Sequence, residues 1–272
     1  MVTRTEVPDH QLPRGAGEGS ADVAVIPAAS VLLLRDGPTE PRAAEKVRRT
    51  KPLAEALPTN AAGRAGLEVL MMQRHARSSF VPAVWVFPGG TLDSHDPRAT
   101  RSTDTVDVMK ICAIRELFEE TGIWLGQPIA DPEGTRQSLL AGRVTIDSLL
   151  DGTSIGPGVL TLTARWITPA GIPKRFDTWF FLAKAARDVR STPQPAEATE
   201  LLWIQPGEAL ARHARGDFPL VFPTIRNLEA IERFGDVREL IESRRHAVIP
   251  VTRPMLVVSD GKKTIVLPDE PC

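Results

Sequence analysis

Three glutamates lie close together in the sequence, at positions 116, 119 and 120. On a helix, this i, i+3, i+4 spacing places their carboxylates on one face within about one turn. Like charges at this spacing repel each other by roughly 0.2–0.5 kcal/mol per pair, so the group needs a countercharge. Hard oxygen ligands suit Mg²⁺ and Mn²⁺. The sequence therefore predicts that Glu116, Glu119 and Glu120 bind a divalent cation.

The neighbouring residues predict the helix that carries these carboxylates. At about 100° per residue, the other two glutamates fall within about 60° of Glu116, whereas Ile114 and Phe118 fall about 160° away. The helix therefore has an acidic face and an opposite apolar face that can be buried. Asp104 is typical of a helix N-cap, and Gly122 is typical of a left-handed C-cap.

A glycine turn precedes this helix. Residues 85–90 read Trp-Val-Phe-Pro-Gly-Gly, which indicates a short strand that runs into a tight turn. Because glycine has no Cβ, the backbone at Gly89 and Gly90 can closely approach a ligand or the helix. We expect both glycines to contribute to substrate binding.

The turn and the helix together resemble the Nudix box, the signature of the Nudix hydrolase superfamily, G-x5-E-x7-R-E-U-x-E-E-x-G-U with U aliphatic. Gly90 matches its start, and residues 115–123, Arg-Glu-Leu-Phe-Glu-Glu-Thr-Gly-Ile, match its second half fully. The first half departs from the pattern. Asp96 stands where the early Glu is expected, and 18 residues rather than seven separate it from Arg115.

An interrupted box of this kind is similar to one branch of the superfamily, the peroxisomal acyl-CoA diphosphatases and their bacterial relatives. The likeness extends from about residue 24 to about residue 245. Besides the box, it rests on residues 87–93, 111–116, 175–181 and 197–203. The resemblance implies an α/β fold, namely a Nudix α/β/α sandwich with a mixed sheet, which we expect to carry a C-terminal helical extension.

The resemblance also implies roles for the residues of the box. The three glutamates would be catalytic and would bind Mg²⁺ or Mn²⁺, and Arg115 would belong to the catalytic group. In the family, the early Glu holds the box arginine. Either Asp93 or Asp96 could take that role here, and the sequence does not decide between them.

Two further glutamates, Glu197 and Glu200, precede a strand predicted at residues 201–204. The resemblance implies that a distal glutamate approaches the metal from across the sheet, so we expect Glu197 or Glu200 to be a metal ligand, with Glu200 also in the catalytic group. A general base must lie within hydrogen-bond reach of the water that it activates. The sequence does not show which glutamate is the base, and either distal residue read alone is a surface carboxylate.

Three cations are candidates for binding a phosphate. Arg74 follows a predicted strand, at a place where many Nudix enzymes carry substrate-binding side chains. Lys174 and Arg175 are adjacent at the mouth of a predicted hairpin, and paired cations beside a diphosphate can hold its oxygens. A solvated basic turn explains Lys174 and Arg175 equally well.

Composition limits the classes of partner. Hydrophobic residues make up 42% and charged residues 25% of the 272 positions, which is ordinary for a globular protein with a sizeable core. The net charge of −1 gives no reason to expect nucleic acid or an anionic membrane as a partner. Two cysteines, Cys112 and Cys272, provide no disulfide framework. We expect a cytoplasmic protein with a small-molecule substrate, and a homodimer is compatible with the sequence.

The domain organisation follows from the order of these segments. We expect a disordered N-terminal tail, a Nudix domain with a loop insertion and a helical extension, and a C-terminal hairpin with a tail. Their boundaries are residues 1–22 for the tail, 23–250 for the domain, 36–66 for the insertion, 206–245 for the extension, and 251–272 for the hairpin and the second tail.

The expected function is metal-dependent hydrolysis of a nucleoside diphosphate derivative. CoA or acyl-CoA is the first choice, cleaved to 3′,5′-ADP and (acyl-)phosphopantetheine. A CoA-directed signature of another Nudix branch requires Arg at 79 and Gly at 83, where this chain has Ser79 and Ala83, so ADP-ribose or NADH remains an alternative substrate. A nucleotide-binding regulatory fold without turnover is the alternative from another class, and the three repelling carboxylates argue against it.

Overall fold

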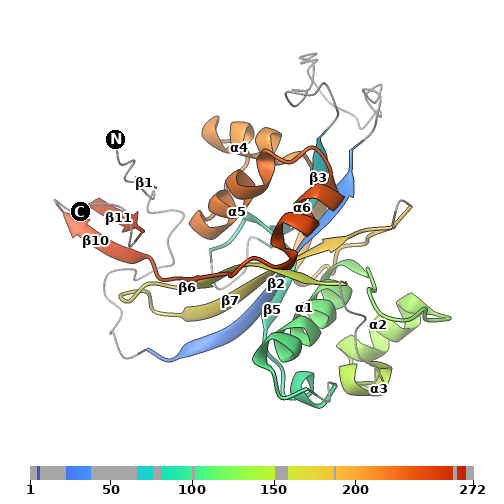
Figure 1. Ribbon diagram of the computed structural model, residues 1–272. Helices are drawn as coiled ribbons and strands as arrows, with labels where there is room; N and C mark the ends of the chain where they lie inside the picture. The colour runs from blue at the N-terminus through green and yellow to red at the C-terminus, as the bar shows by residue number, and fades with distance from the viewer. Residues whose placement is uncertain are drawn as a thin grey trace.

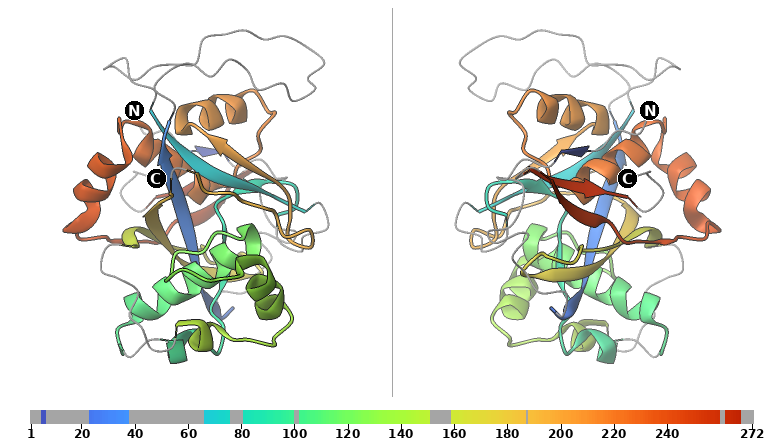
Figure 2. Two further views of the ribbon diagram at one scale, coloured as in Figure 1. Left: turned by 90° about the vertical axis from the view of Figure 1, so that its right-hand side faces the viewer. Right: turned by 90° about the vertical axis from the view of Figure 1, so that its left-hand side faces the viewer.

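The computed structural model describes residues 5–6, 23–37, 66–75, 81–99, 102–150, 159–186, 188–259 and 262–267. Most of the predicted N-terminal tail and nearly all of the predicted insertion at 36–66 lie outside the described residues. The described part forms an eight-stranded mixed sheet with helices on both faces, beside a three-stranded sheet (Figures 1 and 2). The predicted α/β sandwich is confirmed.

The large sheet has the order β4-β3-β2-β7-β6-β9, with β5 paired to β2 and β8 paired to β3. Its strands are β2 (Val25–Asp36), β3 (Leu67–Arg74), β4 (Trp85–Val86), β5 (Gly89–Thr91), β6 (Thr161–Ile167), β7 (Arg175–Lys184), β8 (Ala198–Ile204) and β9 (Val251–Thr252). The central strands β2 and β7 run parallel, with Leu32 opposite Leu182. Both strands are covered on both faces, which explains their continuous apolar runs.

Alternation along β2 divides the core into two layers. Val31 and Leu33 pack in the cluster that contains the helix α1 (Thr105–Thr121). Leu32 and Leu34 point the other way, into the cluster that contains three C-terminal helices. Those helices are α4 (Pro206–Ala214), α5 (Phe222–Glu232) and α6 (Val237–Arg245). The predicted extension at 206–245 thus covers one face of the sheet and forms the second helical layer of the sandwich.

Three short elements surround α1. The 3₁₀ helix η2 (Asp96–Ala99) lies within the interruption of the box and contacts both α1 and α3 (Ile146–Leu150). The helix α2 (Pro132–Leu140) lies against α1. Asp131 as N-cap and Pro132 in the first turn start this helix.

The small sheet joins the two ends of the described chain. The strands β10 (Met255–Ser259) and β11 (Lys262–Val266) form the predicted C-terminal hairpin. The strand β1 (Thr5–Glu6) pairs with β11, in a segment for which the sequence predicted disorder.

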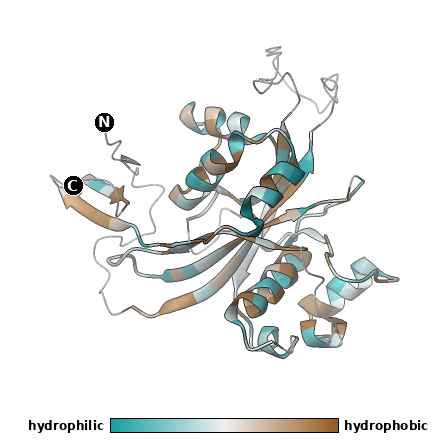
Figure 3. Ribbon diagram, viewed as in Figure 1, coloured by the Kyte–Doolittle hydropathy of each residue, from teal (hydrophilic) through white to brown (hydrophobic). Residues whose placement is uncertain are grey.

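Figure 3 shows polar and apolar residues alternating around α1, as expected for a helix with one buried face. No helix in the described ranges has the length and apolar character needed to cross a membrane.

Candidate active site

The helix α1 places the box residues, and its ends are fixed by local contacts. The Asp104 side chain accepts a hydrogen bond from Val106 N at 2.9 Å. At the other end, Gly122 adopts a left-handed conformation with φ of 74°, and its N–H donates to Phe118 O. Both predicted caps are confirmed. They fix the length of the helix and thereby the face on which the glutamates emerge.

Arg115 is the centre of a buried ionic cluster. Its Nε and Nη2 atoms donate to the two oxygens of Asp96, at 2.8 and 3.0 Å. Its Nη1 atom donates to Glu116 Oε1 at 3.0 Å and to Glu119 Oε2 at 3.1 Å, and Nη2 also donates to Thr91 O. These bonds engage all five N–H groups of the guanidinium. Arg115 therefore positions the glutamates, and each of its N–H groups already has a partner within the protein.

Asp96 takes the role that the sequence left open between two aspartates. Its side chain is fully buried, and its Oδ2 atom also accepts a hydrogen bond from Asp93 N at 2.8 Å. Asp93 is exposed, and its carboxylate accepts from His95 N instead. The turn into η2 brings Asp96 against Arg115 across the 18-residue gap, so the shorter side chain of Asp still reaches the arginine.

Glu116 and Glu119 share the guanidinium and are largely shielded from solvent. Their side chains are 14% and 21% exposed. Burial raises the pKa of Glu116 to about 7; Arg115 opposes this rise and the charge of Glu119 adds to it. Burial also raises the pKa of Glu119, again opposed by Arg115. One arginine therefore does not compensate the desolvation of two carboxylates, and further positive charge would stabilise them.

Glu120 points to the glycine turn. Its Oε2 atom accepts a hydrogen bond from Gly89 N at 2.7 Å, and the residue is 6% exposed. Burial raises its pKa well above the ordinary value, the charge of Glu116 adds to this rise, and the Gly89 hydrogen bond opposes it. Arg74 and Glu197 also affect this carboxyl electrostatically, with opposite signs. The charge of Glu116, one turn earlier on α1, therefore contributes to the raised pKa of Glu120.

The two glycines of the turn are required by close packing. Gly89 has φ of 154°, and a Cβ there would meet Ala29 O at 2.3 Å. A Cβ on Gly90 would lie 2.5 Å from the carboxylate of Glu116. The turn therefore lies directly on the acidic face of α1, and any side chain at either position would displace a wall of the site.

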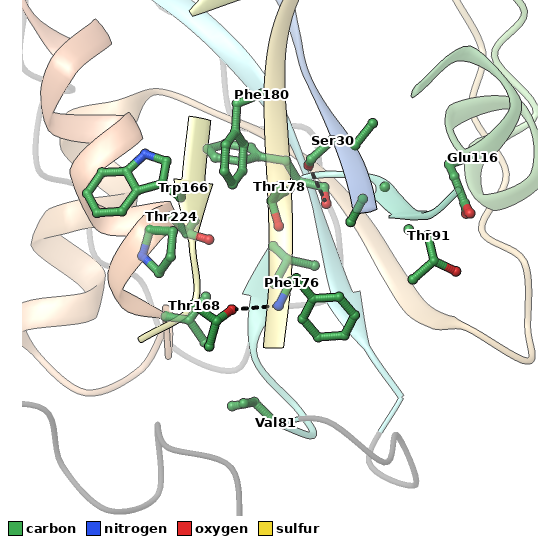
Figure 4. A pocket seen from close by; sticks show the side chains of 18 of the residues that line it. Ser30, Val81, Thr91, Glu116, Trp166, Thr168, Phe176, Thr178, Phe180 and Thr224 are labelled. Carbon is green, nitrogen blue, oxygen red and sulfur yellow. Dashed lines mark hydrogen bonds between the residues drawn. The ribbon is translucent and has the colours of Figure 1, made fainter. Parts of the chain in front are cut away.

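A single cavity of about 560 Å³ connects this acidic face to an apolar region (Figure 4). Its carboxylate end includes Glu116, Glu119, Glu120, Glu197, Arg74 and both glycines. Its apolar end includes Trp166, Ile172, Phe176, Phe180, Phe222, Pro254 and Ile265. Figure 4 shows Glu116 on one side of the cavity and Trp166 with Thr224 on the other. The apolar end was not predicted from the sequence, although alternation along β7 places Phe176 and Phe180 on one face.

The structure separates the two distal glutamates. Glu197 lies just before β8 and lines the cavity. Glu200 lies within β8, opposite Gln73, and is exposed outside the cavity lining. It shares its face of the strand with Leu202, which packs against the core on the side of α4–α6, away from α1. Of the two predicted distal glutamates, only Glu197 thus lies in the lining of the cavity with the three box glutamates.

The three candidate cations are also separated. Arg74 and Lys174 line the cavity, and the Nζ atom of Lys174 lies 5.3 Å from the centre of the Phe176 ring. Arg175 points to the other face of β7, and its Nε atom donates to Thr168 O at 3.0 Å. Arg74 and Lys174 therefore remain candidates for phosphate binding, and Arg175 does not line the site.

The carboxylates fit a divalent cation by their chemistry. Each of Glu116, Glu119 and Glu120 has one oxygen in a hydrogen bond described above, and a carboxylate offers two. Their second oxygens are hard ligands of the kind that Mg²⁺ and Mn²⁺ prefer. Within the described ranges, no group of three or more His, Cys, Asp or Glu side chains already has the arrangement of a metal site. The fit therefore rests on donor type, burial and the need for positive charge.

Comparison with known proteins identifies the family. The sequence model of the NUDIX domain matches residues 52–222, which is more than half of the chain. The chain therefore belongs to the NUDIX family, whose members are generally pyrophosphatases and typically use a divalent metal. This confirms the superfamily predicted from the box.

Two curated relatives carry the same name, acyl-coenzyme A diphosphatase NUDT19. The chicken protein (Gallus gallus) is 26% identical over 246 residues, covering 65% of this chain and 64% of its own length. The human protein is 25% identical over 272 residues, covering 76% of this chain and 72% of its own length. The chain thus spans less than two thirds of the chicken relative, and the homology to the predicted branch is distant.

A solved structure supports the fold. The crystal structure of a NUDIX hydrolase from Alicyclobacillus acidocaldarius has a TM-score of 0.64 to this chain at 24% identity. The similarity covers 84% of this chain and all of the other. The match therefore includes parts of the chain outside residues 52–222, and at this identity it is evidence for the fold alone.

Proposed function

We propose that the chain is a metal-dependent diphosphatase that hydrolyses a nucleoside diphosphate derivative, with CoA or acyl-CoA as its preferred substrate class. The observation that carries this proposal is the continuity of the cavity. One end presents three anchored glutamates and Glu197, which suit a diphosphate with its cation, and the other end presents apolar walls, which suit a long non-nucleotide group.

Four glutamates would hold the ion in this proposal. Glu116, Glu119, Glu120 and Glu197 line the same cavity, and Glu197 is near enough to Glu120 to raise its pKa. A bound divalent cation would neutralise the diphosphate and activate the attacking water. Arg115, held by Asp96, keeps Glu116 and Glu119 at a fixed spacing. The protein's main contribution is this preorganisation, because charge that is already in place costs no rearrangement during the reaction.

Two cations of the chain would bind the phosphates directly. Arg74 lies at the carboxylate end, near enough to Glu120 to affect its pKa, and Lys174 lines the same cavity beside Phe176. A guanidinium and an ammonium can each donate to phosphate oxygens without competing for the carboxylates that hold a cation. Arg74 would orient the diphosphate at the carboxylate end, and Lys174 would bind phosphate oxygens farther along the cavity.

CoA and its acyl derivatives combine the groups that the two ends require. The relatives named as acyl-coenzyme A diphosphatases support this class. Attack of water on the P–O–P bridge of CoA would give 3′,5′-ADP and phosphopantetheine, with the acyl group retained on the second product. The family membership supports the reaction type, and the substrate class is the proposed part.

The test is a product analysis by mass spectrometry. The protein is incubated with Mg²⁺ or Mn²⁺ and a mixture of CoA, acetyl-CoA, a long-chain acyl-CoA, ADP-ribose and NADH. Formation of 3′,5′-ADP is the expected result. AMP without 3′,5′-ADP would move the substrate to ADP-ribose or NADH. Absence of products with both metals, at protein concentrations that exceed trace contamination, would contradict the diphosphatase assignment.

A further inference from the structure

The apolar end of the cavity is closed by a segment from the extreme C-terminal part of the chain. Ile265 of β11 lines the cavity and is 7% exposed, and Pro254, just before β10, lines it as well. Both lie beyond the residues that match the NUDIX domain. Figure 1 shows the hairpin of β10 and β11 on the far side of the sheet from α1. The closure is therefore remote from the carboxylates.

The walls beside Ile265 consist of buried aromatic and aliphatic side chains. Trp166 of β6 packs edge-on against Phe222 of α5, with ring centroids 5.9 Å apart. Phe222 and Ile172 are only 4% and 2% exposed. This ring pair can move only slightly, because the strand and the helix that carry the two rings are fixed in the core. We therefore expect this part of the cavity to keep its shape.

The chemistry of this closed end favours a hydrocarbon chain over a nucleobase. A base buried there would need partners for its ring nitrogens and amino group, and an unsatisfied buried polar group costs about 1–3 kcal/mol. Ile172, Phe222 and Ile265 offer none. The Thr168 hydroxyl accepts a hydrogen bond from Phe176 N at 3.0 Å and keeps its O–H as a donor. Thr178, Thr224 and the Trp166 indole add polar groups to a lining that is otherwise mainly apolar here. An aliphatic chain loses nothing by this burial and gains about 0.8 kcal/mol per methylene.

We propose that this closed end binds the aliphatic chain of an acylated substrate, and that Ile265 sets the longest chain that fits. The inference rests on the proposed function for the substrate class, because it requires the diphosphate to lie at the carboxylate end. It adds that the C-terminal hairpin of the protein decides which acyl-chain length is preferred.

The hairpin itself supplies a matched control. Leu256 of β10 is paired with Ile265 in register, and directly opposed residues of an antiparallel pair point to the same face. Leu256 packs against the same core cluster but does not line the cavity. Truncation of Leu256 therefore reproduces the loss of apolar packing at the hairpin without lengthening the cavity.

The experiment measures two quantities over a series of CoA, acetyl-, octanoyl-, dodecanoyl- and hexadecanoyl-CoA. One is kcat/KM with Mg²⁺, and the other is Kd by calorimetry in EDTA, which needs no turnover. In Ile265→Ala, which removes three side-chain carbons, the preferred length should increase by about two carbons, with on the order of tenfold gain for the shortest chain that wild type rejects. Ile265→Phe should shorten the preferred length, and Leu256→Ala should leave it unchanged.

Four outcomes would overturn the inference. The first two are an unchanged chain-length profile in both Ile265→Ala and Ile265→Phe, and a shift in Leu256→Ala as large as that in Ile265→Ala. The third is a change in Ile265→Ala that is equal for CoA and for every acyl-CoA. The fourth is a wild-type Kd that does not depend on acyl-chain length. A length shift in Kd without any turnover would support the inference and contradict the proposed hydrolysis, whereas turnover without a shift would do the reverse. Ile265→Val, which removes one methyl group, keeps the test available if the larger truncation lowers Tm too far.

Discussion

The two ends of the cavity are built in different ways. Most of the carboxylate end comes from one stretch of about thirty residues, in which β5 lies directly on α1. The apolar end collects side chains from β6, β7, α5 and the C-terminal hairpin, which are widely separated in the sequence. Helical spacing and a tight turn are therefore enough to bring the carboxylates together locally. The shape of the apolar end depends on the whole fold.

The two ends also differ in what stabilises them. At the carboxylate end, burial works against the charged glutamates, and Arg115 compensates only part of that cost. At the apolar end, burial of the side chains is itself favourable. The edge-on contact of Trp166 with Phe222 adds a preferred ring geometry. Changes at the first end should therefore alter turnover for every substrate, and changes at the second should alter discrimination between substrates.

The largest expected effect comes from neutralising one glutamate. Glu119→Gln or Glu120→Gln should lower kcat by at least about a hundredfold in excess Mg²⁺, because the several kcal/mol of charge stabilisation at the diphosphate depends on these ligands. Steady-state assays with CoA and a long-chain acyl-CoA should show equal losses for both substrates. Wild-type turnover in either variant would disprove the assignment of the metal site.

The same assay can compare the distal glutamates. Glu197→Gln should lower kcat, because Glu197 lines the cavity, whereas Glu200→Gln, at a position outside the cavity lining, should change it by less than about twofold. The reverse order would show that the strand's alternation does not decide which glutamate reaches the cation.

Removal of the arginine's partner should have the next largest effect, on folding. Asp96→Ala leaves the guanidinium of Arg115 buried without its bidentate partner, which should cost about 3–5 kcal/mol in the free energy of unfolding. Urea denaturation measures this change. Asp93→Ala serves as the control, since Asp93 is exposed, and its cost should stay below about 1 kcal/mol. Equal costs for the two variants would contradict the role of Asp96.

A smaller effect is expected from the turn. In Gly90→Ala, the new methyl group would lie against the carboxylate of Glu116, so we expect kcat to fall by roughly tenfold as this ligand moves. Gly66→Ala is the matched control, because a Cβ there meets no atom within 4 Å. Near-UV circular dichroism should show an intact fold in both variants. Unchanged turnover in Gly90→Ala would mean that the Glu116 carboxylate can move without consequence.

The smallest effect is a pH dependence of cation binding. With a pKa of about 7, Glu116 is mostly neutral below that pH and charged above it. The Mn²⁺ affinity of the metal-free protein should therefore rise with pH up to about 7, by at most about tenfold per unit. Titration followed by electron paramagnetic resonance measures this affinity, and Glu116→Gln should flatten the profile.

The stability of the metal-free protein should change in the opposite direction. The raised pKa means that the contribution of Glu116 to stability is fully present below its ordinary pKa of 4.5 and is lost as the pH rises through about 7. Thermal denaturation between these pH values measures the loss. A flat wild-type profile in both experiments would contradict the raised pKa.

The interrupted box shows how far local patterns reach. The helix α1, both its caps and its acidic face were predictable, because each depends on contacts within a few residues. The choice between Asp93 and Asp96 was not, because the 18 residues between Asp96 and Arg115 can return in many ways. Only the turn into η2 and its contacts with α1 and α3 select Asp96.

The sequence by itself determined the family, the α/β fold and the three clustered glutamates, since helical periodicity, caps and turn glycines act over short distances. The tertiary structure decided which distant residues join them. It retained Glu197 and Arg74 and excluded Glu200 and Arg175, because side chains alternate between the two faces of a strand. It also made 206–245 a layer of the sandwich and closed the apolar end with the C-terminal hairpin, because long-range packing fixes which buried surfaces meet.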